Sequence, residues 1–520
     1  MKNSLNLNKH YAVILLLLLI VSGSVLRFYK LGSPTLDTDE ISSVLLSRRD
    51  MSKIVYRSWH PGSVDDLAKV EEPPFPYLLM HASLKINDSD TMARLPSAIL
   101  GIAGILVIFV LAKQWFNKTT ALWSSFLLTF SLYHIFYSQL ARGYAGFLLF
   151  VMLSFYFLLR YTHHQNRVNL MGLILSNAGG IYFHYAMLHV IIIESVMFFV
   201  LPFFAVNSHR RPKPLLKSFL MMCGVFFVLS LPIFPSIVST VRGRLGGDTL
   251  AFEFNPAYLK NVLCRYGAGN GIAFYVYIFF AVAGIFMGLK NMDKRKSILA
   301  LLFWLCIPFL LIAVTGYRYD FHIRYFIYAF PAYILFVGNG ISSVGGVVAR
   351  KLSDGKGKVF FSVITIFLFL SLSIVPLRLY YSMPAKMTDW KAIARYIARN
   401  YSPDKRVYIE SSFCVYELGY YLDKIAPGVK LYTVDGDKAK FMQVCSEKKD
   451  SIWYVDNSPV FDSLVFRYFD TRVEFVSTVF YELGKRELID WDKSWFSQAN
   501  IRRYFPCIYL NSAEKGKGRL

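Results

Sequence analysis

Acidic residues are scarce in most of this 520-residue chain, which holds 34 Asp and Glu against 57 Lys and Arg. Residues 1–380 contain only sixteen of the acidic residues, and ten of those sixteen fall between Asp37 and Asp90. Carboxylates are therefore concentrated in one short segment and nearly absent around it. This segment is either a solvated loop or a functional site, and composition alone does not decide between the two.

Several other patterns are absent, and each absence excludes a class of site. The six cysteines have no metal-ligand spacing, no histidine pair has the helical spacing of a zinc site, and the C-terminal part carries no glycine-rich phosphate loop. A disulfide between Cys414 and Cys445 stays an option if that part is extracytoplasmic. The first apolar run, 11–26, lacks a small-residue cleavage site, so we expect a membrane anchor there.

Apolar residues are abundant in the chain, which has 55% hydrophobic and 17% aromatic residues and a mean hydropathy of +0.40. This composition predicts a polytopic membrane protein. The net charge of +23 lies mostly in residues 1–380, in short connections between apolar runs. Charge placed in that way sets membrane topology, so we expect no nucleic-acid partner.

The apolar runs predict about eleven transmembrane helices, because a bilayer core requires about 20 mostly apolar residues per crossing. The predicted spans are 11–28, 94–112, 120–136, 144–160, 170–186, 187–206, 218–238, 271–289, 298–315, 325–345 and 359–379. The run Pro73–Ile86 is shorter and begins with two prolines, which predicts an interfacial or re-entrant segment.

Positive charge predicts the orientation of these spans. Lys and Arg gather at the N-terminus and in the alternate connections 113–119, 160–169, 207–217, 290–297 and 346–358. By the positive-inside rule these connections and the N-terminus are cytoplasmic. The loop 29–93 and the C-terminal part then lie on the outer side of the cell (inner) membrane, in the periplasmic or extracellular space.

The chain changes character after residue 380. Strand-like runs at 406–410, 430–434 and 451–456 alternate with helical patterns at 388–399, 413–422 and 437–446. Such alternation predicts a small α/β domain with a largely parallel sheet. We therefore expect a helical transmembrane domain at 1–380, with an outer catalytic loop at 29–93, and an extracytoplasmic α/β domain at 381–520.

The first candidate site is the pair Asp39-Glu40, which follows the first predicted span. An inverting sugar transfer needs one carboxylate to take the proton of an acceptor hydroxyl, and a phosphate leaving group needs little protonation. Asp39 is the candidate base, and Glu40 is a supporting catalytic residue. Both also suit the start of a helix over Ile41–Leu46, with Asp39 as N-cap, and capping is compatible with catalysis.

Glu72 opens the second candidate motif, Glu72-Pro-Pro-Phe-Pro-Tyr77, whose prolines fix the backbone. We assign Glu72 and Tyr77 to the substrate pocket. A divalent metal ion held by Glu72 with His60, His81 or His184 is an alternative, and no cofactor is certain.

Arginines at the predicted outer ends of spans form a third group. Arg142 either reaches to lipid headgroups or holds an anion, and the guanidinium fork suits phosphate. A pair of arginines on the outer side, Arg318 and Arg324, is not explained by the positive-inside rule and also favours an anionic ligand. Polar residues near these arginines complete the predicted pocket: Tyr137, Gln139, Tyr144, His184 and Tyr325. Glu194 is expected to face the bundle interior.

Taken together, these motifs resemble the GT-C superfamily of integral membrane glycosyltransferases. The closer resemblance is to glycosyltransferase family 39 and to bacterial lipopolysaccharide sugar and aminoarabinose transferases. The residues that carry it run in the expected order from 31 to 331: Asp39-Glu40-Ile-Ser, Glu72-Pro-Pro-Phe-Pro-Tyr-Leu-Leu, Ala93-Arg-Leu-Pro-Ser-Ala98, Tyr133-His-Ile-Phe-Tyr-Ser-Gln-Leu-Ala-Arg142-Gly-Tyr144, His184-Tyr185 and Arg324-Tyr325. This chain departs from the family pattern at two positions. Leu140 stands where relatives often carry an acidic residue, and Glu72 stands where many carry histidine.

The resemblance implies a GT-C-like fold and a polyprenyl-phosphate-linked sugar as donor, taken from the outer leaflet. It implies Asp39 as base, and Arg142 or Arg324 as ligand of the lipid phosphate. The acceptor is expected to be a hydroxyl group of a cell-surface glycan, lipid or protein, and membrane lipids are the other partners.

Two rival functions stay open. An oligosaccharide polymerase or ligase of the same fold would move a chain instead of one sugar. A lipid-linked sugar transporter or flippase would predict inverted repeats and charges near the membrane midplane, and only Glu194 fits that description.

Overall fold

The computed structural model describes residues 2–60, 72–200, 213–245, 256–269, 271–315, 323–351, 355–382, 389–401, 406–409, 412–433, 452–456, 473–476 and 507–511. By their contacts the residues form two compact units. The helical unit comprises Met1–Leu31 and Ser43–Tyr381, and the α/β unit comprises Gly32–Ser42 and Ser382–Leu520. The segment Gly32–Ser42 thus groups with the C-terminal residues and not with the transmembrane helices on either side of it in the sequence.

Helices make up the described part of the helical unit. In chain order they are α1 (Lys2–Phe28), α2 (Thr38–Ser47, whose first residues belong to the α/β unit), α3 (Met51–Trp59), α4 (Phe75–Ile86), α5 (Asp90–Trp115), α6 (Lys118–Phe130), α7 (Leu132–Ser138), α8 (Tyr144–His163), α9 (Arg167–Phe183), α10 (Met187–Val200), α11 (Lys213–Ser230), η3 (Leu231–Ile233), α12 (Phe234–Leu245), α13 (Pro256–Tyr266), α14 (Ile272–Lys290), α15 (Met292–Thr315), η4 (Ile323–Ala329), α16 (Phe330–Lys351) and α17 (Gly355–Ser382).

Each of the eleven predicted spans contains a helix, which confirms the helical membrane fold. Seven segments in the described part of the chain are long and apolar enough to cross a bilayer by length and composition. The predicted span 120–136 is divided at Ser131, whose hydroxyl accepts the amide of His134 at 3.3 Å and begins α7. An N-cap residue inside an apolar run therefore ends one helix and starts the next.

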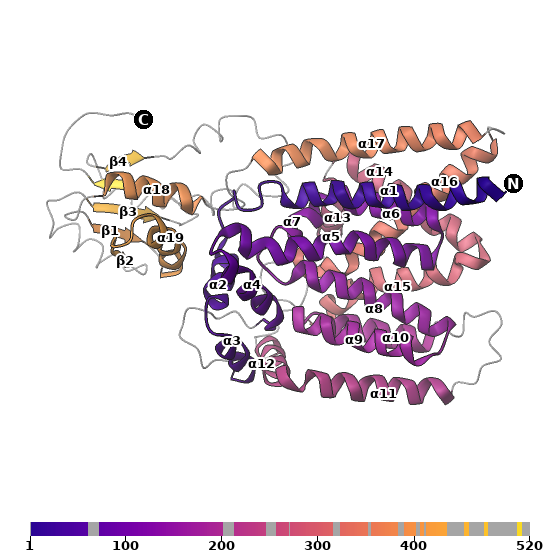
Figure 1. The fold of residues 1–520 in the computed structure, drawn as a ribbon, viewed down its shortest axis with the longest axis horizontal. Coiled ribbons are helices and arrows are strands. Elements are labelled where there is room, and N and C mark those ends of the chain that lie inside the picture. The colour runs from indigo at the N-terminus through magenta and orange to yellow at the C-terminus, as the bar shows by residue number, and fades with distance from the viewer. Residues whose placement is uncertain are drawn as a thin grey trace. The chain divides into compact units, whose positions relative to one another are not determined.

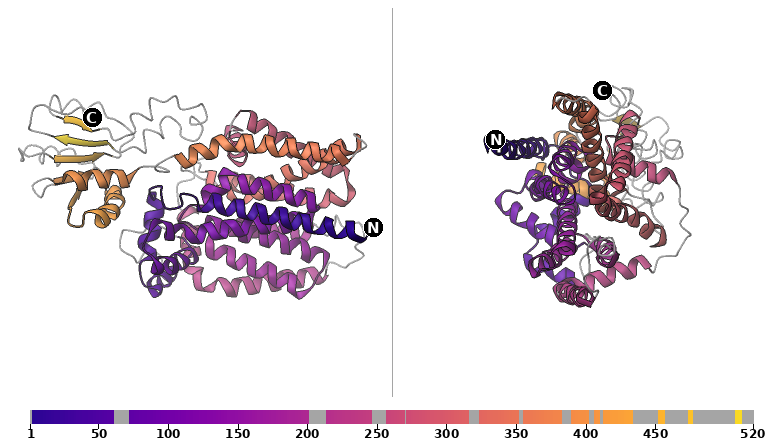
Figure 2. Two further views of the ribbon diagram at one scale, coloured as in Figure 1. Left: turned by 45° about the horizontal axis from the view of Figure 1, so that its top comes forward. Right: turned by 90° about the vertical axis from the view of Figure 1, so that its right-hand side faces the viewer.

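The long helices pack side by side, in the sequence α1, α5, α8, α9 and α11, with α6, α16 and α14 forming a second packed series (Figures 1 and 2). One apolar core runs through the bundle, and Phe147, Phe155, Trp304 and Tyr328 are completely buried in it. The short helices α3, α4 and α12 lie at the end of the bundle opposite the N-terminus (Figure 1). With 12 residues, α4 is about 18 Å long, too short to cross a bilayer.

Glu194 faces the bundle interior as predicted. Its side chain is completely buried on α10, and Oε2 accepts a hydrogen bond from Asn177 Nδ2 of α9 at 2.8 Å. This contact ties two neighbouring helices together within the apolar core.

The α/β unit contains α18 (Trp390–Asn400), β1 (Arg406–Ile409), α19 (Ser412–Ile425), β2 (Leu431–Thr433), β3 (Ile452–Asp456), β4 (Val473–Val476) and β5 (Cys507–Asn511). The sheet order is β2-β1-β3-β5-β4. Strand β1 pairs in parallel with β2 and β3, with Tyr408 opposite Tyr432 and Tyr454.

The prediction of a largely parallel sheet is right for these three strands and wrong for the remainder, because β5 runs antiparallel to both β3 and β4. A strand that returns from the far end of the chain carries no local pattern that reveals its direction. The predicted helix 437–446 and the cysteine Cys445 lie outside the described residues, so the predicted Cys414–Cys445 pair does too.

Candidate active site

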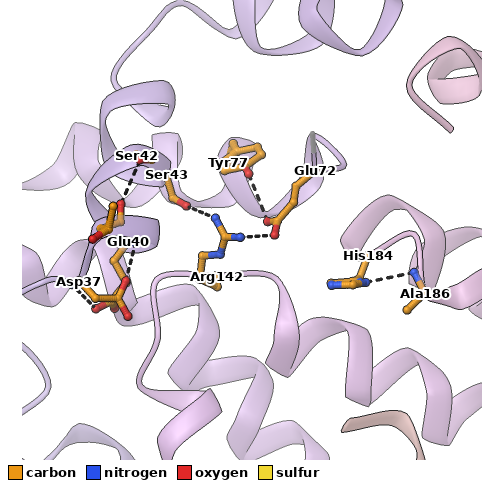
Figure 3. A network of polar contacts seen from close by, with 10 residues as sticks. Asp37, Glu40, Ser42, Ser43, Glu72, Tyr77, Arg142, His184 and Ala186 are labelled. Atoms are coloured by element: carbon orange, nitrogen blue, oxygen red, sulfur yellow. Dashed lines mark hydrogen bonds and ion pairs between the residues drawn. The ribbon is translucent and has the colours of Figure 1, made fainter. Parts of the chain in front are cut away.

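The loop before α2 ends in a reciprocal capping box. Asp37 Oδ1 accepts the amide of Glu40 at 2.8 Å, and Glu40 Oε2 accepts the amide of Asp37 at 3.2 Å (Figure 3). The amide of Ile41 also bonds to the carbonyl of Asp37. Asp37 is therefore the N-cap, and the prediction that Asp39 takes this place is wrong, because the Asp-x-x-Glu pair matches the geometry of a capping box.

The capping box separates the roles of the two predicted catalytic carboxylates. Glu40 is completely buried at the third position of α2, which confirms the helix-start interpretation of this residue. Asp39 is half-buried in the first turn and takes no part in the box. Negative side chains in the first turn are stabilised by the helix dipole, so a carboxylate fits there on electrostatic grounds.

The segment that carries these residues is held by the C-terminal helices. Thr35 Oγ1 donates to Asp389 Oδ1 at 2.7 Å, and the amide of Leu36 donates to the Tyr421 hydroxyl at 2.8 Å. The ammonium group of Lys391 donates to the carbonyl of Gly32 at 2.9 Å. These hydrogen bonds and the burial of Thr35 and Leu36 explain why the segment groups with the α/β unit.

Glu417 is a buried acidic residue that was not predicted from the sequence. It lies on α19, is 3% exposed, and accepts a hydrogen bond from the hydroxyl of Thr38. Burial, together with the negative charges of Asp37 and Asp39, raises the pKa of Glu417 to about 7, although the Thr38 hydrogen bond opposes this shift. The sequence signal was a glutamate beside Leu418 and one turn before Tyr421, on the apolar face of a predicted helix.

Arg142 is the centre of a polar cluster within the helical unit (Figure 3). Its guanidinium donates to Ser43 Oγ at 3.0 Å and forms an ion pair with Glu72, which also accepts from the Tyr77 hydroxyl at 3.2 Å. Burial and the nearby Glu72 raise the pKa of Tyr77, which keeps the phenol protonated as a donor. Since Arg142 is only 7% exposed, the interpretation that its side chain reaches to lipid headgroups is wrong.

Aromatic rings connect the other predicted pocket residues. The rings of Tyr137 and Tyr144 lie 5.1 Å apart, and those of Tyr144 and His184 lie 5.5 Å apart. The His184 Nδ1 atom accepts the amide of Ala186 at 3.0 Å, which fixes the ring (Figure 3).

Two arginines accompany this aromatic row. The guanidinium of Arg324 lies 5.8 Å from the ring centre of Tyr325. Arg324 and Arg265 both act electrostatically on Tyr137. Arg265 was not among the predicted site residues, although an arginine in a predicted outer loop is the same signal that singled out Arg318 and Arg324. Arg318 lies outside the described residues.

Gln139 has a structural role. Its amide nitrogen donates to the carbonyls of Arg27 and Tyr29, at 2.9 and 3.0 Å, and its Oε1 accepts from the Tyr380 hydroxyl. These bonds satisfy carbonyl groups at the C-terminal end of α1.

The candidate metal ligands do not come together. His81 turns Nδ1 to the carbonyl of Ser47 at 2.8 Å, and His60 stacks on Tyr56. In the described part of the chain no three His, Cys, Asp or Glu side chains are grouped to hold a metal ion. The described residues around Glu72 therefore form no set of metal ligands.

A bundle of apolar helices with buried carboxylates and arginines near the helix ends defines an integral membrane protein with a candidate catalytic site. Residues 71–237 match the family model described as dolichyl-phosphate-mannose-protein mannosyltransferase. Comparison with curated protein sequences gave no match.

Solved structures share the fold at low sequence identity. ArnT from Cupriavidus metallidurans in the apo state aligns with a TM-score of 0.56 and 12% identity, over 96% of this chain and 98% of its own. ArnT bound to undecaprenyl phosphate aligns with a TM-score of 0.55 and 14% identity, over 97% and 99% of the two chains. The Archaeoglobus fulgidus oligosaccharyltransferase tethered with an acceptor peptide aligns with a TM-score of 0.52 and 13% identity, over 86% and 69%.

The chain has the fold of the GT-C superfamily of membrane glycosyltransferases, as the sequence resemblance implied. The family model covers residues 71–237, and the solved structures show the fold alone. The activity, the sugar, the acceptor and the stereochemical course are therefore matters for proposal.

Proposed function

We propose that this protein transfers a sugar from a polyprenyl-phosphate-linked donor to a hydroxyl group of a cell-surface glycan, lipid or protein. The reaction takes place on the outer face of the cell membrane and inverts the anomeric centre. The observation that carries the proposal is the start of α2, where Asp37 and Glu40 cap the helix and Asp39 lies between them outside the capping box. ArnT, a protein of the same fold, binds undecaprenyl phosphate, which supports a lipid phosphate as the leaving group.

In the proposed reaction the carboxylate of Asp39 takes the proton of the acceptor hydroxyl. The hydroxyl oxygen forms a bond to the anomeric carbon, and the bond from that carbon to the phosphate oxygen breaks. The electron pair of this bond leaves with the polyprenyl phosphate. Arginines stabilise the developing negative charge, and the candidates are Arg142, Arg318 and Arg324, with Arg265 added by its place beside Tyr137.

The remaining predicted pocket residues position the donor. Tyr137, Tyr144, His184 and Tyr325 supply rings and hydroxyl groups suited to a sugar, and Glu72 and Tyr77 orient Arg142. A guanidinium already paired with a carboxylate is fixed in place before the phosphate arrives, which favours preorganised stabilisation of charge.

The experiment uses membranes that contain the full-length protein and a polyprenyl-phosphate mannose donor, chosen because the matching family model names a lipid-phosphate mannose. Mass spectrometry measures released polyprenyl phosphate and the mass added to a cell-surface extract. We expect release together with the addition of a single sugar, and the same result for the control variant Asp88→Asn, an exposed carboxylate paired with Arg48.

Donors extracted from the source cells extend the test to other sugars. The addition of a chain of sugars would favour the polymerase or ligase reaction. If no lipid-linked donor is consumed, although undecaprenyl phosphate binds, the proposed transfer is wrong.

A further inference from the structure

The C-terminal α/β unit contributes a buried carboxyl group to the segment that carries the proposed base. Glu417 lies on α19, in a part of the chain 379 residues away from Thr38. The Thr38 hydroxyl donates to its Oε1, and Thr38 immediately precedes Asp39.

Side chains of α18, its N-cap and α19 hold the segment 32–38. Asp389, the N-cap of α18, binds Thr35, and Lys391 of α18 binds Gly32 and Ser33. Tyr421 and Glu417 of α19 bind Leu36 and Thr38. Among these side chains, Glu417 is buried and its pKa of about 7 allows its charge to change near neutrality.

Several elements that pack against α19 carry charged residues near Glu417. The segment before α2 and its first turn contribute Asp37 and Asp39, which both act on Glu417. Asp389, the N-cap of α18, is engaged by Thr35 and by the amide of Ala392, and Lys391 of α18 lies 5.7 Å from the ring centre of Tyr421. The other charged side chains described on α18, Arg395 and Arg399, are exposed. Strands β1 and β2 also pack against α19. Strand β2 carries no charged residue, and β1 carries Arg406.

We propose that Glu417 is a positioning residue that holds Asp39 for catalysis through its hydrogen bond with the neighbouring Thr38. When its carboxyl group is neutral, the acid accepts the Thr38 hydroxyl and adds no charge beside Asp37 and Asp39. When Glu417 loses its proton, three carboxylates crowd one short segment, and like-charge repulsion displaces the first turn of α2. The C-terminal unit thereby keeps the proposed base in place and makes catalysis sensitive to pH.

This inference depends on the proposed function, because Asp39 is the residue being positioned. The test compares wild type with Glu417→Gln, Glu417→Ala and Asp39→Asn, using full-length protein in membranes and the polyprenyl-phosphate mannose assay described above. Asp423→Asn is the matched control, because Asp423 lies on the same helix but is exposed.

We expect the turnover rate of wild type and Asp423→Asn to fall as pH rises through about 7, the pKa of Glu417. Glu417→Gln keeps an acceptor for Thr38 and cannot ionise, so its rate should not fall in this range. Glu417→Ala loses the acceptor, and its turnover should drop on the order of tenfold at every pH with little change in KM for the donor, as expected for misplacement of a reacting group.

Hydrogen exchange supplies a second measurement that does not depend on activity. In Glu417→Ala the amides of Leu36 and Ile41 should exchange faster than in wild type, whereas Glu417→Gln should protect them. The inference is overturned if Glu417→Gln keeps the wild-type pH profile and Glu417→Ala leaves the exchange of these amides unchanged. If Asp39→Asn keeps full activity, the proposed function fails instead, so the two failures are distinguishable.

Discussion

Three carboxylates within four positions, Asp37, Asp39 and Glu40, have different surroundings. Asp37 and Glu40 exchange hydrogen bonds with each other's backbone amides, so both are committed to the start of α2. Asp39 has neither of these bonds and is half-buried in the first turn. The sequence alone marks the cluster, and the backbone geometry distinguishes its members.

Replacement of the N-cap tests the capping box directly. Asp37→Ala removes the acceptor for the Glu40 amide and should destabilise the start of α2 by about 1 kcal/mol. Asp37→Asn keeps a good capping oxygen and should behave as wild type. Thermal unfolding in detergent and hydrogen exchange of residues 38–47 measure the difference. Equal exchange in the two variants would contradict the assigned cap.

The raised pKa of Glu417 predicts how stability depends on pH. The folded protein holds this proton up to about pH 7, whereas the unfolded chain releases it near 4.5. Between these values the unfolded chain binds fewer protons, so the free energy of unfolding contributed by this group falls as pH rises. Exchange protection of α19 should decrease from pH 5 to pH 7 in wild type and stay level in Glu417→Gln. A level profile in wild type would show that Glu417 is ionised throughout.

At the scale of elements, buried side chains join helices that are far apart in sequence. Arg27 of α1 donates to the carbonyls of Leu128 and Thr129 at the end of α6, and its guanidinium lies 2.7 Å from His134 Nδ1 of α7. Gln139 binds the end of α1 in return. The break at Ser131 leaves carbonyl groups at the end of α6 without partners within the helix, and Arg27 supplies donors for two of them.

Arg142 lies two residues before α8 and forms an ion pair with Glu72 beside the proline-rich start of α4. Arg142 is buried and Glu72 is partly buried. Arg142→Met leaves Glu72 without its ion-pair partner and should lower the free energy of unfolding by about 3 kcal/mol. The double variant Glu72→Gln with Arg142→Met removes both charges and should recover much of this loss. Thermal unfolding measures stability, and undecaprenyl phosphate binding reports the proposed phosphate role. A double variant no more stable than Arg142→Met would contradict this account.

The limits of prediction at this scale have physical causes. Apolar length predicted a helix in each of the eleven spans, because a bilayer imposes a strong local requirement. It did not predict the short helices α3 and α13 or the division between α6 and α7. The sequence predicted β1, β2 and β3 from short apolar runs. It missed β4 and β5, the contact of Glu417 with Thr38 and the aromatic neighbours of Arg265, since each depends on packing between distant segments.

At the scale of the whole molecule, the placement of Lys and Arg predicts an orientation with a cytoplasmic N-terminus. Reporter proteins active on only one side of the membrane, fused within the connections 113–119 and 346–358, should report the cytoplasm. A fusion after Leu520 should report the outer side. A cytoplasmic signal from that last fusion would contradict the orientation and with it the outer location of the proposed reaction.

The central claim is that Asp39 is the base of a sugar transfer from a lipid phosphate. The most direct test measures polyprenyl phosphate release by Asp39→Asn, with Asp88→Asn as control and with undecaprenyl phosphate binding measured in parallel. The account predicts a loss of turnover of about 10²-fold or more, unchanged binding of undecaprenyl phosphate, and a control that matches wild type. Wild-type turnover by Asp39→Asn would contradict the account.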